Sequence, residues 1–136
     1  MNNNIWEKDN FERGRLIGIR FGANLPIGYP VIDGFYEGTA LSIRSMDLTK
    51  KTWQDTEAAR REIEIELEEL ASFSGTSSPW GSDEIHITNE DIYWRILRII
   101  IPENTDTEIF DPVFYELECY AYELEIEFEV IKFAIS

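Results

Sequence analysis

The sequence has very little cysteine or histidine. It contains one cysteine, Cys119, and one histidine, His86. A single cysteine excludes a disulfide within the chain, and a single histidine leaves no residues for a histidine-rich metal site. We expect Cys119 to be a buried structural thiol on a helix and His86 to be a half-exposed packing residue on a strand.

Long apolar runs are also absent. No stretch of about 18 consecutive apolar residues occurs, which a membrane-spanning helix would need. Residues 1–8 have neither the basic start nor the apolar run of a signal peptide. We therefore expect a protein that acts in the cytosol and has no membrane partner.

Basic residues become scarce along the chain. The sequence has 12 Lys and Arg against 27 Asp and Glu, a formal net charge of −15. Up to Arg61 there are 9 basic and 8 acidic residues, whereas from Glu62 onward there are 3 basic and 19 acidic residues. Because nucleic-acid affinity comes largely from Lys and Arg at phosphates, a polyanion could be bound only by the first part. The acidic second part could bind a basic partner, or its charges could simply keep the protein soluble.

The length and composition predict one compact domain. The chain has 136 residues, of which 43% are hydrophobic and 13% aromatic. A single hydrophobic core commonly serves about 100 to 150 residues. We expect one domain over residues 1–136, with enough apolar material to exclude a disordered chain.

Glycine and proline divide the first third of the chain into elements. Apolar spacing predicts a helix within residues 6–24 that stops before Pro26. Two prolines and a glycine in residues 25–30 predict a constrained turn, followed by an extended segment at residues 31–33. A hairpin-like turn over residues 34–38 then leads into a strand at residues 39–46.

The middle of the chain predicts a long helix. Thr52 and Asp55 have the spacing of a capping box, and the helix should run from there to about Phe73. Residues 62–67 alternate like a strand, but the cap and the apolar spacing on either side favour a helix.

The last part of the chain predicts a strand, a longer strand, a helix and a final strand. Residues 85–88 and 93–101 read as strands, the second one central because its end is continuously apolar. Asp111 is expected to cap a helix, and residues 124–135 alternate glutamate with apolar residues, as a strand with one acidic face does. The expected fold is α/β (α+β), a mixed central sheet flanked by helices.

Two neighbouring segments carry a resemblance to a known family. Residues 25–33 read LPIGYPVID, and residues 38–48 read GTALSIRSMDL. They are similar to the C-terminal toxin domains of contact-dependent growth inhibition (CdiA-type) proteins, in which an LP-x-GYPVID stretch leads to a strand reading roughly GVATSIKSIDL. A weaker similarity covers most of the chain from about Arg13. The resemblance implies a restriction-endonuclease-like fold.

The resemblance also implies a set of site residues. Family members resemble PD-(D/E)xK nucleases, in which acidic residues hold a divalent metal and a lysine steadies the developing charge. Asp33 matches the strand aspartate, Ser42-x-Arg44 matches the family's Ser-x-Lys, and Glu12 lies on the helix that should supply a further acid. Asp33 and Glu12 are thus the expected ligands of Mg²⁺ or Zn²⁺. Basic side chains of the first part could clamp a phosphate, and the candidates are Arg13, Arg15, Lys50 and Lys51.

Two departures from the family pattern leave the function open. Arg44 keeps a positive charge but cannot readily release a proton as a lysine can, and the helix acid has no secure match. The first hypothesis is a toxin domain with metal-dependent cleavage of DNA or tRNA, weak or lost, that a cognate immunity protein neutralises. The alternative is a non-catalytic acidic protein, an immunity-like antagonist or decoy, that binds a basic protein such as a toxin.

Overall fold

The regular elements follow one another as helix, hairpin and two helix–strand units. The computed structural model describes residues 4–133. Within this range the helices and strands, in chain order, are α1 (Asn10–Phe21), β1 (Gly34–Tyr36), β2 (Thr39–Ser45), α2 (Thr56–Ser72), β3 (Trp94–Pro102), α3 (Asp111–Glu123) and β4 (Glu127–Phe133). Among the described residues, no helix combines the length and the apolar character that crossing a bilayer requires.

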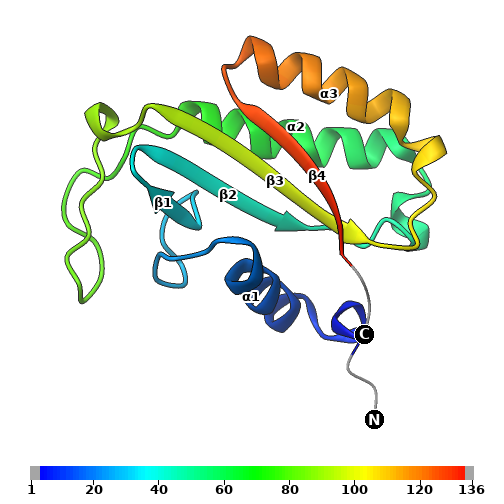
Figure 1. Ribbon diagram of the computed structural model, residues 1–136, viewed down its shortest axis with the longest axis horizontal. Helices are drawn as coiled ribbons and strands as arrows, with labels where there is room; N and C mark the ends of the chain where they lie inside the picture. The colour runs from blue at the N-terminus through cyan, green and yellow to red at the C-terminus, as the bar shows by residue number, and fades with distance from the viewer. Residues whose placement is uncertain (1–3, 134–136) are drawn as a thin grey trace.

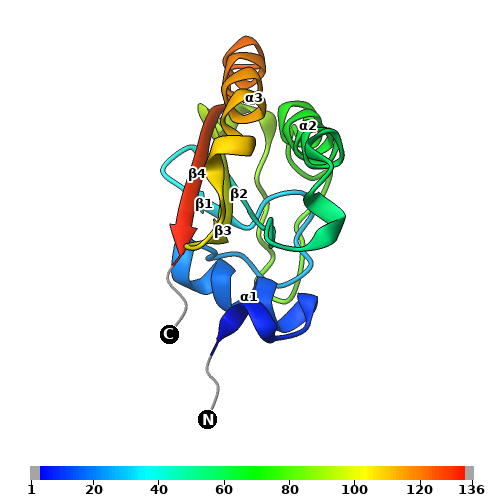
Figure 2. The same cartoon turned by 90° about the vertical axis from the view of Figure 1, so that its right-hand side faces the viewer.

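The strands form one mixed sheet in the order β1-β2-β3-β4. β1 runs antiparallel to β2, whereas β2, β3 and β4 are parallel to one another. Each parallel pair needs a crossover connection, and α2 and α3 provide the two crossovers. Both helices lie side by side on one face of the sheet, and α1 lies on the other face (Figures 1 and 2). The expected mixed sheet flanked by helices is confirmed.

Strand β3 is the centre of the core. Its side chains Leu97, Ile99 and Ile101 are fully buried beneath α2 and α3. On the opposite face, Ile100 is fully buried against Trp6 and Ile17. The prediction that this strand is buried on both faces is confirmed, because the continuous apolar run serves two layers at once.

Helix α1 is fixed to the sheet at its carboxyl end. The Arg98 guanidinium donates to the Phe21 carbonyl at 2.5 Å, and the Tyr36 hydroxyl donates to the Gly22 carbonyl at 2.6 Å. These donors satisfy carbonyls that a helix end leaves without intrahelical partners. At the other end, the Asp9 side chain accepts from the Glu12 amide at 2.9 Å, as a helix N-cap does.

The two expected helix caps are displaced. Residues Lys51–Trp53 form a 3₁₀ turn, and α2 begins after Asp55, whose carboxylate accepts from the Glu57 amide at 3.0 Å. The prediction of a cap at Thr52 is therefore wrong, although Asp55 does take part. Similarly, Asp111 is the first helical residue of α3 and Phe110 occupies the cap position.

Two segments expected to be extended are not strands. Residues 85–88 belong to a long arm between α2 and β3, in which the isolated bridges Gly75–Thr88 and Trp80–Ile85 take the place of a strand ladder. Residues 31–33 form a tight loop in which Val31 has a φ of 63°, so the first strand starts at Gly34. Both segments are short, and neither gains a full strand partner.

Two predictions about single side chains are also wrong. Cys119 is exposed. The buried face of α3 carries Val113, Leu117 and Ala121, and Cys119, which lies two residues from both Leu117 and Ala121, is on the opposite face. His86 is exposed on the arm, where its Nε2 lies 3.0 Å from the Thr76 carbonyl.

The β1–β2 hairpin turns on two residues with positive φ. Glu37 has a φ of 46° and Gly38 a φ of 90°, and they link the paired residues Tyr36 and Thr39. Two consecutive left-handed residues are typical of a type I′ turn, which fits the twist of the flanking strands. A Cβ at Gly38 would lie 2.6 Å from the Tyr93 ring. Both the positive φ and this lack of space disfavour any residue other than glycine at the position.

We expect Gly38→Ala to lower the free energy of unfolding by about 1 to 3 kcal/mol, because alanine would be strained at this positive φ and would crowd Tyr93. Gly14→Ala is the opposite case. No atom lies within 4 Å of a Cβ built at Gly14, and alanine in a helix interior is favoured over glycine by about 1 kcal/mol. Urea unfolding of both variants measures the two effects, and a Gly38→Ala variant as stable as the parent would contradict this account.

Candidate functional site

A groove separates α1 from residues 25–33, hereafter the 25–33 loop. Its volume is about 580 Å³. One wall is the face of α1 that carries Gly14 and Gly18, the other is the 25–33 loop, and Asp33 and Ile43 also line it. The two halves of the sequence pattern that carries the family resemblance therefore meet at one hollow.

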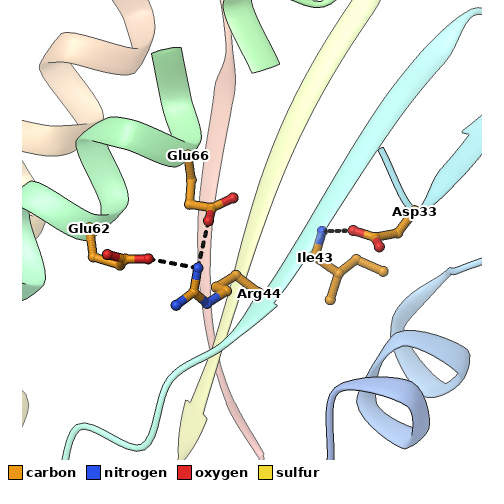
Figure 3. Close-up of polar contacts among 5 residues, drawn as sticks. All are labelled: Asp33, Ile43, Arg44, Glu62 and Glu66. Carbon is orange, nitrogen blue, oxygen red and sulfur yellow. Dashed lines mark hydrogen bonds and ion pairs between the residues drawn. The ribbon is translucent and has the colours of Figure 1, made fainter. Parts of the chain in front are cut away.

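Asp33 is held at the edge of the sheet. Its carboxylate accepts from the Ile43 amide at 2.7 Å (Figure 3). Its own amide donates to the Leu41 carbonyl at 2.8 Å. Burial raises the pKa of the Asp33 carboxyl, and the hydrogen bond from Ile43 opposes this shift only in part. Asp33 is thus a partly buried acid whose protonated form is favoured more than in an ordinary aspartate.

Arg44 points away from this groove. Side chains alternate along a strand, so Ser42 and Arg44 share the face beneath α2, whereas Ile43 faces the groove. The Arg44 Nη1 lies 2.9 Å from Glu62 and 2.5 Å from Glu66, both on α2. Figure 3 shows Arg44 and Asp33 on opposite sides of β2. Ser42 is only 4% exposed on the Arg44 side.

The two glutamates neutralise the Arg44 charge. Burial raises the pKa of Glu66, and the nearby Arg44 lowers it without cancelling the shift. Glu62 and Glu66 are four residues apart, which places both carboxylates on one face of α2. In this arrangement the Arg44 guanidinium is a partly exposed ion-pair partner, and Arg44 lines a second, smaller hollow but not the groove itself.

Glu12 does not join Asp33. It is half-buried on α1 and is not among the residues that line the groove. The α1 residues that line the groove with Asp33 include Gly14 and Gly18, which bring no side chain, and none of the lining residues of α1 is acidic. Glycine lowers helix propensity, and the sequence alone assigned these two positions no role in the site. Their spacing of four residues was the signal that they share a face.

Two of the four expected phosphate-binding residues line the site. Arg15 lines the groove, and Arg13 lines a second hollow of about 310 Å³ beside it. The Arg13 Nε donates to the Ser45 hydroxyl at 3.3 Å, and its guanidinium lies 5.5 Å from the Trp6 ring centre. Burial lowers the pKa of Arg13, a shift that nearby Asp47 opposes. Lys50 and Lys51 are exposed after β2 and line neither hollow.

The described residues do not form a metal site at the groove. Between residues 4 and 133, no group of three or more His, Cys, Asp or Glu side chains is arranged to hold a metal ion. Asp33 is the one carboxylate among the groove's lining residues in this range, and one of its oxygens accepts from Ile43. A protein-held zinc needs about three or four ligands, and this donor set does not supply them.

Comparison with known proteins decides the family. The family model of the CDI toxin restriction endonuclease-like domain matches residues 13–131. The chain belongs to this family. A solved chain from the "CdiA-CT/CdiI toxin and immunity complex from Yersinia pseudotuberculosis" is similar in fold, with a TM-score of 0.67 and 16% sequence identity over 88% of this chain and 96% of that one. No curated protein matches the sequence.

The CDI toxin domain family confirms the restriction-endonuclease-like fold that the resemblance implied. Asp33, Ser42 and Arg44 lie within the matched residues, whereas Glu12 lies just before them. Glu12 thus lies outside both the groove's lining and the limits of the family match. The roles of all four residues stay predictions.

We expect Asp33→Asn to raise the free energy of unfolding at pH 7 and to leave it nearly unchanged near pH 3. A protein with an acid whose pKa is raised in the folded state loses stability as the pH rises above the pKa of that acid in the unfolded state, which is about 3.9 for aspartate. Asparagine stays neutral, and its side-chain oxygen can still accept from the Ile43 amide. Urea unfolding between these pH values tests it, with Asp83→Asn on the exposed arm as the control. A less stable Asp33→Asn variant at pH 7 would argue against burial as the cause.

We expect Arg44→Gln to destabilise the domain at pH 7, because Glu62 and Glu66 would then face each other without a cation. A double-mutant cycle with Glu66→Gln should give a coupling of about 1 kcal/mol for this partly exposed pair. Arg61→Gln is the matched control, since Arg61 is exposed on α2, the helix that carries Glu62 and Glu66, and has no ion pair within residues 4–133. A coupling near zero would show that the ion pair does not fix Arg44.

Proposed function

We propose that this domain is a nucleic-acid-directed toxin domain of interbacterial competition whose phosphodiester cleavage is weak or lost. The observation that carries the proposal is the position of Asp33, a partly buried acid beside a groove that Arg15 also lines. The second acid that efficient cleavage would require is missing from the groove's described lining.

The distribution of unpaired positive charge supports the nucleic-acid part of the proposal. Arg44, Arg60 and Arg98 each form an ion pair with glutamate. Within residues 4–133, the arginines of α1 form none. Arg15, one of these arginines, lines the groove, so positive charge that has no ion pair is available to a phosphate there.

The position of each expected catalytic group explains why cleavage should be slow. Asp33 can accept a proton from an attacking water, and its raised pKa makes the carboxylate a stronger base than an ordinary aspartate. Arg44 could stabilise charge only after leaving Glu62 and Glu66, and Ser42 lies beneath α2. A divalent cation, Mg²⁺ or Zn²⁺, would find Asp33 as its one charged ligand in the groove's described lining, so we assign no step to it.

A cognate immunity protein is the proposed partner. The structurally similar chain comes from a complex of a toxin with its immunity protein. We extend this arrangement to the present domain and place its action in the cytosol of a competing bacterium. The alternative role as an immunity-like antagonist is not favoured, because the matched family is one of toxin domains.

Incubation of the purified chain with plasmid DNA and with tRNA, in Mg²⁺, Mn²⁺ or Zn²⁺, tests the proposal. We expect slow cleavage that falls by about 100-fold or more in Asp33→Ala, the typical range for loss of a general base. Asp83→Ala, prepared in the same way, should cleave as the parent does and so controls for a contaminating nuclease. Cleavage that is unaffected by Asp33→Ala would refute the catalytic assignment.

A further inference from the structure

The groove continues beyond Asp33 across the bare surface of α1. The larger hollow and the smaller one share Asn10, Gly14 and Ile43. No atom lies within 4 Å of the position where a Cβ at Gly14 would be. A ligand can therefore pass over Gly14 from one hollow into the other, close to the helix backbone.

The rim of this path is apolar and exposed. Phe11 and Ile19 on α1 are 69% and 63% exposed, and Ile27 on the 25–33 loop is 69% exposed. All three line the larger hollow. Exposed apolar side chains gathered around one groove mark a binding site more often than isolated ones do. An aromatic ring such as Phe11 offers a flat surface on which a nucleotide base can stack.

Three arginines line the same path, and two of them have no ion pair within residues 4–133, whereas Arg44 at the smaller hollow is paired with glutamates. Arg15 lines the larger hollow with Phe11, and Arg13 lines the smaller one. Ser45 and the Trp6 ring hold the Arg13 guanidinium in place. A groove that combines cations with an exposed ring suits single-stranded nucleic acid, in which the phosphates and the faces of the bases are both accessible. A duplex keeps its bases stacked inside and would leave Phe11 without a partner.

We propose that this groove holds an unpaired nucleotide strand. One base stacks on Phe11 against Ile27, and the adjoining phosphates lie at Arg15 and Arg13. The strand crosses α1 at Gly14 and passes Asp33. This inference rests on the proposed function and deepens it, since it names the substrate class of the same groove as single-stranded or locally unpaired nucleic acid.

Fluorescence anisotropy with labelled oligothymidylate, oligouridylate and a blunt DNA duplex tests the inference. Both single strands should bind at least about tenfold more tightly than the duplex, which corresponds to about 1.4 kcal/mol. The comparison of the two single strands distinguishes DNA from RNA as the source of the ligand. Equal or tighter binding of the duplex would overturn the inference.

Three variants assign the binding to the groove. Phe11→Ala should weaken single-strand binding by about tenfold, the typical effect of losing one stacking ring. Arg15→Gln should reduce the slope of log affinity against log salt by about 0.7, the value for one phosphate contact of a single strand. Gly14→Leu should abolish binding without loss of stability, because its side chain enters the open path and leucine favours a helix.

Matched controls lie on the other face of the sheet. Tyr115→Ala removes an aromatic side chain that is 70% exposed on α3, close to the 69% of Phe11. Arg61→Gln removes an exposed arginine from α2. Both control variants should bind like the parent. If they weaken binding as much as Phe11→Ala and Arg15→Gln do, the strand does not lie in the groove.

The outcomes separate this inference from the cleavage proposal. Single-strand binding that depends on Phe11 but is followed by no cleavage supports the groove assignment and contradicts the catalytic one. Duplex cleavage that Gly14→Leu leaves unchanged supports the cleavage proposal and contradicts the assignment of a single strand to the groove. Should Gly14→Leu prove less stable in urea, Phe11→Ala and Arg15→Gln decide the inference alone, since both change exposed side chains.

Discussion

The rest of the fold depends on the burial of β3 on both faces. Its apolar side chains must be covered by α2 and α3 on one side and by α1 on the other, while β2 and β4 pair with its two edges. Because β2, β3 and β4 are parallel, the chain has to return to the start of the next strand through a helix that lies over one face of the sheet. Both of these crossover helices lie on the same face. The opposite face is left to α1 and the 25–33 loop, and the groove lies between these two.

The alternation of side chains on β2 then decides which residues can act together. Ile43 faces the groove, so its neighbour Arg44 must face α2, where Glu62 and Glu66 bind it. Asp33 escapes this alternation because it lies in the loop just before β1 and reaches the strand edge through the Ile43 amide. The candidate acid and the candidate cation thus come from adjacent segments yet serve different layers of the domain.

The sequence was informative where a pattern repeats and uninformative where a single contact decides. Periodicity predicted the three helices and the central strand, because burial of one face or of both faces acts over many residues. The family resemblance led to Asp33, which the structure places beside a groove. The ion pairs of Arg44 and the absence of Glu12 from the groove's lining could not be predicted, since the first needs the distance between β2 and α2 and the second needs the position of α1 against the 25–33 loop.

The placement of the helices separates charge across the molecule. α1 has three arginines against one glutamate, whereas α2 has six glutamates against two arginines and α3 has four acidic residues and no basic one. The two groups lie on opposite faces of a thin sheet (Figure 2), so the protein is an electric dipole despite its negative net charge. In the field of a polyanion such a dipole turns its α1 side toward the polyanion before contact, and low ionic strength strengthens this orientation. The acidic helices that oppose binding at long range also select the direction from which the groove is approached.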